Sequence, residues 1–224
     1  MTNAFVQSQL DAYAAAAPTR PGRRLRWLDE LREQNRAAFA AGGLPGARDE
    51  QWKYTQLKAL EKRALASDQH ATTRPVDATR LELPGTGAPR LVFVNGAFRA
   101  DLSRVESAEG LTLLSLADAL ERGDTGLEFF LSRRFRAPAE GFAQLNTALA
   151  HDGAVVRVAP GARVAAPLHL VHVGAPGDRA IAWHARNLVE LGEGAALSIV
   201  EHHVGAAAHD GVGNVVTQLG LAAG

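Results

Sequence analysis

The chain lacks several features that would point to common classes of function. It contains no cysteine, so no disulfide can form and no thiolate can act as a nucleophile. Its formal net charge is zero, from 24 basic and 24 acidic residues, which leaves no field to attract nucleic acid or an anionic membrane. No apolar run approaches the ~20 residues that cross a bilayer, and residues 1–20 lack the basic start and apolar core of a secretory leader. We therefore expect a cytoplasmic protein without nucleic-acid or membrane partners.

What the chain does contain is enough apolar material for a core, in two regions of different character. Hydrophobic residues make up 46% of the 224 positions, which argues against disorder. All 8 Phe lie before residue 150, and 11 of the 22 Gly lie after it. The sequence predicts an α+β fold, with a mainly helical region over residues 1–150 and β-structure over residues 151–224.

The first region has helical periodicity and one hairpin signal. Apolar residues at helical spacing indicate a helix over residues 22–41, which Gly42 and Gly43 end. Asn95-Gly96 between two apolar stretches favours a tight β-hairpin near residues 90–99, since both central positions need positive φ. Further helices are expected at residues 57–64, with Thr55 as N-cap, after an N-cap at Ser115, and at residues 127–136 and 139–150.

The second region contains a loose internal repeat. Val158-Ala-Pro-Gly-Ala162, Leu191-Gly-Glu-Gly-Ala195 and Leu221-Ala-Ala-Gly224 share one pattern at spacings of 33 and 30 residues. Small turns at equal periods between short strands indicate coils of a β-helix or a stacked sandwich. The chain stops within the third repeat, so we expect a truncated β-core whose open edge could pair with another chain.

Rare residues gather in the segment Arg48-Asp-Glu-Gln-Trp-Lys-Tyr-Thr-Gln-Leu57. It places Trp52, Lys53 and Tyr54 side by side in a chain with three Trp, three Lys and two Tyr. Aromatic side chains beside a cation are common at protein interfaces. Local packing against the helical region is the simpler interpretation, and we favour it.

This segment resembles a signature of the SufB/SufD family of iron–sulfur cluster assembly scaffolds, and the SufD type more closely. Four further stretches resemble the family in the same order, so that the similarity spans roughly residues 44 to 224. They are Arg90-Leu-Val-Phe-Val-Asn-Gly96, Phe142-Ala-Gln-Leu-Asn-Thr-Ala148 with His151-Asp-Gly153, Pro167-Leu-His-Leu170 and Ile199-Val-Glu-His-His203. Members of this family are about twice as long as this chain.

The resemblance implies a non-catalytic scaffold subunit of a SufBCD-type complex, here as an N-terminal fragment. It also implies a helical region followed by the first coils of a right-handed parallel β-helix. Such scaffolds pair with a SufB-like paralogue through their β-helix cores, and with a SufC-like ABC ATPase, which hydrolyses the ATP, through a C-terminal helical region. We expect the ATPase contact to be lost in this chain.

The resemblance also limits which site residues can be carried over. The family's cluster-binding residues lie in its C-terminal half, so none is assigned here, and without cysteine the chain cannot hold an iron–sulfur cluster in the usual way. We therefore expect no cofactor on this chain alone. The family signature maps onto residues with an expected structural role, namely Arg48, Glu50, Trp52, Lys53, Tyr54 and Thr55.

Histidines are the sharpest candidates for chemistry of the chain's own. Strand alternation places His169 and His172 on opposite faces, whereas Glu201 and His203 share one face. A metal site from His169, Glu201 and His203 on adjacent coils is conceivable, because imidazole and carboxylate suit several divalent metals. The alternatives to the scaffold are therefore a β-helix or cupin-like metal-dependent enzyme and a self-associating oligomerisation module. Ordinary structural histidines remain the favoured interpretation, and no G-x-S-x-G or nucleotide-binding motif is present.

Overall fold

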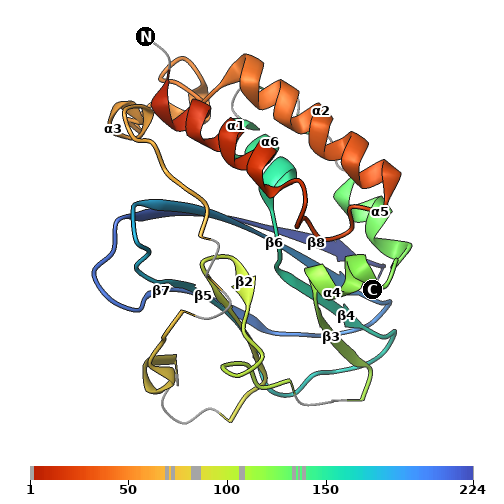
Figure 1. Cartoon of the computed structure of the whole chain (residues 1–224). Helices are drawn as coiled ribbons and strands as arrows, with labels where there is room; N and C mark the ends of the chain where they lie inside the picture. Colours follow the sequence, from red (N-terminus) through yellow and green to blue (C-terminus); the bar gives the residue numbers. More distant parts are fainter. Residues whose placement is uncertain are drawn as a thin grey trace.

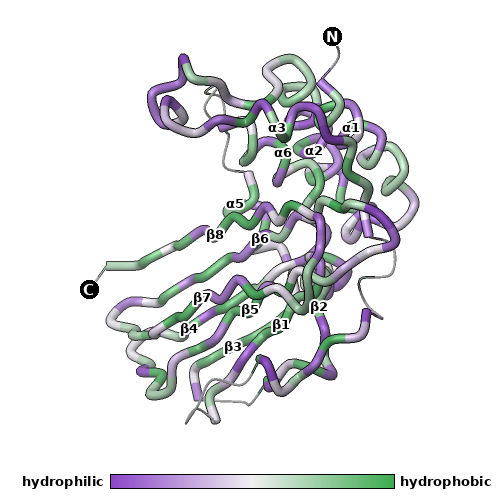
Figure 2. Tube along the Cα trace, turned by 90° about the vertical axis from the view of Figure 1, so that its left-hand side faces the viewer, coloured by the Kyte–Doolittle hydropathy of each residue, from purple (hydrophilic) through white to green (hydrophobic). Residues whose placement is uncertain are grey.

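The computed structural model describes residues 3–68, 71, 74–81, 87–105, 109–132, 135, 137 and 140–223. A layer of helices lies against one of two four-stranded sheets, and the second sheet lies beneath the first (Figure 1). Seen from the side, the strands run next to one another and the helices gather on one side of them (Figure 2). The α+β class is thus confirmed. Among the helices that can be traced here, none has the length and apolar character needed to cross a membrane.

The helices follow the predicted pattern only in part. The long helix α2 ends where glycine allows it to, because the C-cap Gly43 has a φ of 69°. Ser115 caps α4 as predicted, by accepting a hydrogen bond of 3.0 Å from the backbone N–H of Asp118. The helical elements are α1 (Ala4–Ala16), α2 (Arg26–Gly42), η1 (Glu50–Trp52), α3 (Lys58–Glu61), η3 (Ala78–Leu81), α4 (Leu116–Glu121), α5 (Gly126–Leu131) and α6 (Gly141–Leu149).

Several local predictions in the helical region are wrong. The helix expected to reach residue 64 is the four-residue α3, and its N-cap position is Leu57 rather than Thr55. A short helix of this kind has little propensity to extend without an apolar face to bury. α5 ends at Leu131, and most of the residues that follow it up to 136 lie outside the described ranges. The 13-residue helix α1 was not predicted, and Asn3 is its capping side chain.

Each sheet combines strands from both halves of the chain. One sheet has the order β2-β1-β5-β7 and the other β3-β4-β6-β8. Because β1 pairs with β5 and β3 with β4, strand pairing crosses residue 150, and a division there stays a prediction. The strands are β1 (Arg90–Val94), β2 (Ala97–Phe98), β3 (Leu111–Ser115), β4 (Ala154–Val158), β5 (Leu168–Gly174), β6 (Ile181–Leu191), β7 (Ile199–Gly205) and β8 (Gly211–Leu221).

The predicted hairpin is present. β1 and β2 pair antiparallel, with Phe93 opposite Phe98 and Val94 opposite Ala97. Asn95 and Gly96 form the turn with φ values of 46° and 81°, the positive values that a two-residue turn of this type requires.

The sequence repeat sets the register of the parallel strands. From β4 onward the chain alternates between the two sheets, and each strand lies parallel to the next one in its own sheet. Val158 pairs with Leu191, and Leu191 pairs with Leu221, so the three repeat motifs occupy equivalent places. Gly161 and Gly194, 33 residues apart, both have positive φ in the turns that follow. Gly224, the last glycine of the predicted repeat, lies outside the described residues.

Alternation along the strands divides the core into layers. Leu168 and Leu170 of β5 face the space between the sheets, where they meet Val156 and Val189. Val171 and Val173 face away and pack beneath the segment around Leu81 and Leu102. On the far side of the other sheet, residues of β4 and β6 pack against α2, α4 and α5.

A buried carboxylate joins the helices to the sheets. Asp152 accepts hydrogen bonds of 3.0, 3.0 and 2.8 Å from the backbone N–H groups of Phe98 in β2, Ala117 in α4 and Gly153. Burial raises the pKa of Asp152 to about 6, although the three N–H donors favour the charged form. The folded state therefore binds more protons than the unfolded chain between pH 4 and 6, and this group's stabilisation is lost as the pH rises through that window.

We expect Asp152→Asn to lower the free energy of unfolding by about 1–3 kcal/mol at pH 7, because the new amide donor must face a backbone N–H donor. The difference in the free energy of unfolding between the variant and the wild type should shrink by on the order of 3 kcal/mol as the pH rises from 4 to 6. Urea unfolding across this range measures both effects, and Asp118→Asn is the matched control. A difference that widens with pH would contradict the raised pKa.

Candidate functional site

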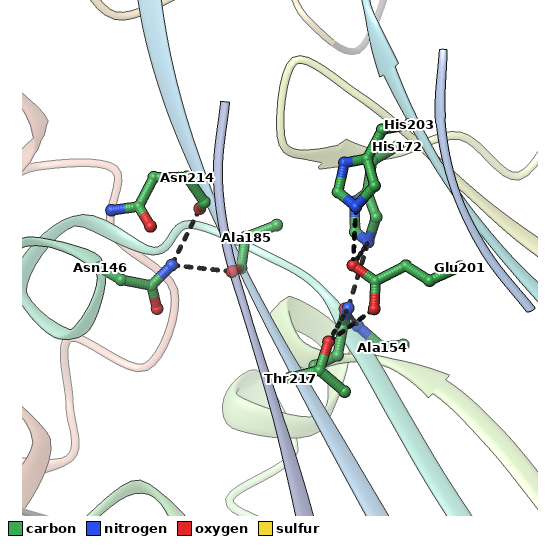
Figure 3. A network of polar contacts seen from close by, with 9 residues as sticks. Asn146, Ala154, His172, Ala185, Glu201, His203, Asn214 and Thr217 are labelled. Carbon is green, nitrogen blue, oxygen red and sulfur yellow. Dashed lines mark hydrogen bonds and ion pairs between the residues drawn. The ribbon is translucent and has the colours of Figure 1, made fainter. Parts of the chain in front are cut away.

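The space between the two sheets changes from apolar to polar along the strands. Beyond Leu170 and Ile199, the inward positions carry histidine, glutamate, asparagine and threonine (Figure 3). We call this set the polar cluster: His172 of β5, Asn187 of β6, Glu201 and His203 of β7 and Thr217 of β8.

The register of the repeat brings these side chains together. His172 lies directly opposite His203, and Asn187 lies opposite Thr217. Their rings and amides point inward because each lies an even number of residues from an apolar core position, such as Leu170 or Val189. The two halves of the cluster therefore come from opposite sheets and meet in the middle.

A continuous path of hydrogen bonds crosses the cluster. The Asn187 side-chain amide lies 3.1 Å from His172 Nε2 and donates to Thr217 Oγ1 at 3.1 Å. The Thr217 hydroxyl in turn donates to Glu201 Oε2 at 2.9 Å. Glu201 Oε1 lies 3.0 Å from His203 Nε2 and 3.9 Å from His172 Nε2.

His172 is held neutral at the inner end of this path. Burial is the main cause that lowers its pKa to about 4; Glu201 opposes the shift and His203 adds to it. Its ring stacks on Phe93 at 5.4 Å and on His203 at 5.4 Å. Since Nε2 accepts from Asn187, the proton sits on Nδ1, which is buried without a hydrogen-bond partner in the described structure.

The structure brings together only part of the predicted histidine site. Glu201 and His203 share a face as predicted, but His169 does not join them. His169 points to the outer face beside Val171, where its Nδ1 lies 2.8 Å from Nε2 of His202. The residue that joins Glu201 and His203 is instead His172, which the sequence analysis did not include in the candidate metal site. Its signal was the 31-residue spacing to His203, which matches the repeat period.

The cluster is a hydrogen-bonded polar network, and it has no assembled metal centre. Across the described part of the chain, no three His, Asp or Glu side chains are placed to hold a metal ion. The Glu201 carboxylate is already bonded to Thr217 and His203. Buried His172 and exposed His203 lie at the two ends of this hydrogen-bonded path, which reaches the surface at β7 and β8.

The signature segment is divided between packing and exposure. The Trp52 ring packs on Phe142 of α6 with centroids 5.2 Å apart, as the favoured interpretation of local packing requires. Lys53 stacks its ammonium 5.6 Å from the Tyr54 ring, and Tyr54 is 89% exposed. Arg48, Glu50 and Thr55 are also exposed, and their roles stay predictions.

Fold and cluster together define a repeating two-sheet α+β protein with a polar layer in the interior between its sheets. The chain belongs to the SufBD family, because the family described as "SufBD protein N-terminal region" matches residues 6–170. The chain is 31% identical over 165 residues to the iron–sulfur cluster assembly protein SufD of Escherichia coli (strain K12). It is 28% identical over 161 residues to an iron–sulfur cluster assembly SufBD family protein of Synechocystis sp..

These alignments cover most of the chain and a minor part of its relatives. They include 72% and 71% of this chain, but 36% and 35% of the two relatives. The matched region contains the signature segment, both strands of the hairpin and His169. The whole polar cluster, from His172 to Thr217, lies beyond the residues that the family profile matches.

We expect His172→Phe to remove an acid-induced loss of stability. The folded pKa lies below the unfolded value, so the wild type loses stability as the pH falls from 6.5 towards 4, by on the order of 3 kcal/mol. Phenylalanine keeps the stacking on Phe93 and has no proton to gain. Thermal unfolding at pH 7.5 and 4.5 measures the difference, with His203→Phe as control. An unchanged acid response in His172→Phe would show that this histidine does not titrate as described.

Trp52→Ala should lower the free energy of unfolding by about 1–2 kcal/mol, because it removes the aromatic contact with α6. Tyr54→Ala should change it by less than about 0.5 kcal/mol, since that ring is exposed. Urea unfolding of the two variants compares them directly. Equal losses of unfolding free energy in the two variants would mean that the segment is stabilised as a whole and not by the Trp52 contact.

Proposed function

We propose that this chain acts as part of a non-catalytic scaffold subunit in iron–sulfur cluster assembly, in a complex of the SufBCD type. The observation that carries the proposal is the family match over residues 6–170, together with the similarity to a protein described as SufD. The resemblance of the signature segment from Arg48 to Thr55 supports the same assignment. The iron–sulfur cluster is the cargo of this complex. The ATPase subunit of the complex hydrolyses the ATP.

The architecture supports this role. Strands that alternate between two sheets and repeat every 30–33 residues fit the first coils of a right-handed parallel β-helix. Within the described part of the chain, β7 and β8 are the last strands of their sheets, and each has one neighbour. Unpaired strand edges are templates for further β-pairing. We propose that the core of a SufB-like paralogue, or the β-core of the same subunit, lies on this side of the molecule.

The open edge also favours one second candidate, self-association. Leu219 and Leu221 of β8 are 60% and 70% exposed beside this edge. An apolar end of this kind can be covered by a second copy of the chain. In that case the apparent mass would rise with protein concentration, whereas the scaffold role calls for a different subunit.

The contact with the SufC-like ATPase is proposed to lie outside this chain. The family resemblance assigns that contact to a C-terminal helical region, which the matched residues 6–170 do not include. The 224-residue chain should therefore bind no such ATPase by itself. A longer SufD-type protein that carries residues 6–170 of this chain should bind it.

A chimera tests the proposal directly. Residues 6–170 replace the aligned part of the Escherichia coli relative, and the hybrid is co-expressed with a SufB-like paralogue and a SufC-like ATPase. We expect both partners to co-purify with the hybrid and iron–sulfur enzymes to regain activity in cells that lack SufD. The isolated chain should retain no ATPase under the same conditions. A folded hybrid that restores no cluster assembly, or an isolated chain that retains stoichiometric ATPase, would refute the respective part.

A further inference from the structure

A cavity of about 610 Å³ opens between α1, the β1–β2 hairpin, the end of α6 and β6. Its volume lies within the range of small-molecule sites, which is about 300–1,000 Å³. The wall combines alanines and apolar side chains with a few charged and polar groups. Those that matter for the argument are Ala16, Arg20, Asp68, His151, Trp183 and His184.

Two of the polar groups in the wall are already engaged. The buried Asp68 carboxylate receives two hydrogen bonds of 2.9 Å from Arg74 and one of 2.6 Å from Asn95. His184 lies 3.1 Å from Gln9 Oε1 through Nε2 and 3.2 Å from the Asn214 amide through Nδ1. Burial lowers the pKa of His184 to about 3, so the ring stays neutral. These groups hold α1 and the hairpin to the sheet and are not free for a ligand.

Two other groups in the wall have donor capacity to spare. The Arg20 guanidinium lies 3.7 Å from the Tyr13 ring and donates through Nη2 to the Tyr13 carbonyl. Its Nε is buried and has no hydrogen-bond partner in the described structure. The His151 ring is exposed at the same wall, and no hydrogen bond to it occurs among the described residues. Because Nε is buried and Nη2 is engaged, the guanidinium nitrogen left for an acceptor on a ligand is Nη1, which makes no hydrogen bond to the described residues.

The surroundings of these donors carry positive charge. Arg32, 2% exposed, donates at 2.9 Å to the carbonyl of Pro21, next to Arg20, and its nearest ion-pair carboxylate, Asp29, is 4.0 Å away. Burial and the Arg20 charge lower the pKa of Arg32 to about 10. Burial and then the Arg32 charge lower the pKa of His151. The neighbouring Glu33 is held by Arg36 at 2.6–3.0 Å.

We propose that this cavity binds a small organic anion, whose carboxylate or phosphate head lies against Arg20 and His151. The apolar body of the ligand lies along Ala12 and Ala16 of α1 and meets Leu149 and Trp183 on the opposite side. An Arg guanidinium and a neutral imidazole N–H can both donate to the same anionic head. The site goes beyond the proposed scaffold role and does not depend on it.

Three probes separate the parts of the proposed ligand. Phenyl phosphate and benzoate carry the two possible heads on one apolar body, and benzyl alcohol carries the body without a charge. Isothermal titration calorimetry with the full chain should detect binding of phenyl phosphate, of benzoate or of both. Benzyl alcohol should bind at least ten-fold more weakly. The stronger of the two anions identifies the head. Equal binding of all three probes, or binding of none at millimolar concentration, would overturn the proposal.

Matched variants locate the binding. Arg20→Gln should weaken binding of the more tightly bound anion at least ten-fold. Arg24→Gln, which removes an exposed charge four residues further along the chain, should leave this binding unchanged. Ala16→Phe fills the cavity without changing its charge and should abolish binding, so the proposal can be tested even if Arg20→Gln does not fold. Equal losses in Arg20→Gln and Arg24→Gln, or full binding by Ala16→Phe, would show that the anion binds elsewhere.

Discussion

The buried carboxylate of Asp152, followed by Gly153, is the constraint on which the arrangement of helices and sheets depends. Asp152 satisfies N–H groups from β2, from the first turn of α4 and from its own neighbour. At Gly153 the chain passes so close to β6 that a Cβ atom would lie 2.0 Å from the Arg186 carbonyl oxygen. The next backbone N–H, of Ala154, donates to the Asn187 side chain at 3.0 Å. Three consecutive residues thus fix the hairpin, a helix and the pairing of β4 with β6.

The parallel register that starts at this junction also produces the polar cluster. Once β4 is aligned with β6, every residue one period further along the chain falls on the same face of the neighbouring strand. His172 is thereby stacked on His203, and Asn187 is set opposite Thr217. The interior is apolar where Val156, Leu170 and Val189 meet, which anchors the sheets. The polar layer beside this apolar part could not be buried at the same low cost without the hydrogen bonds that link its members.

The sequence predicted what depends on local chemistry and on periodicity. The Asn95-Gly96 turn, the end of α2 and the Ser115 cap each follow from a residue's own backbone preference or side-chain reach. The 33- and 30-residue spacings correctly aligned Val158, Leu191 and Leu221. The pairing of β1 with β5 and the meeting of Glu201 with His172 were missed, because both depend on which strands become neighbours in space. A spacing of 30 to 33 residues relates His172 to His203 but also His169 to Glu201 and His202, so the repeat period alone does not choose between the two histidines.

Helix α1 illustrates why part of the fold is invisible to local patterns. Its sequence is rich in alanine and has a weak apolar face, so periodicity gives no reason to expect a docked helix. It is held by one fully buried side chain, Phe5, which packs with Phe39 and Leu145, and by a few specific polar contacts. Gln9 reaches both the Leu65 carbonyl and His184, and Ser8 accepts from the Leu65 N–H. The same small side chains that make its packing inconspicuous leave room beside Arg20 and His151. A helix that served packing alone would be better stabilised by larger residues that fill this space, because empty volume forfeits contacts. The alanine face, Arg20 and His151 therefore belong to one feature, a cavity on the side of the sheet that carries the family's fold.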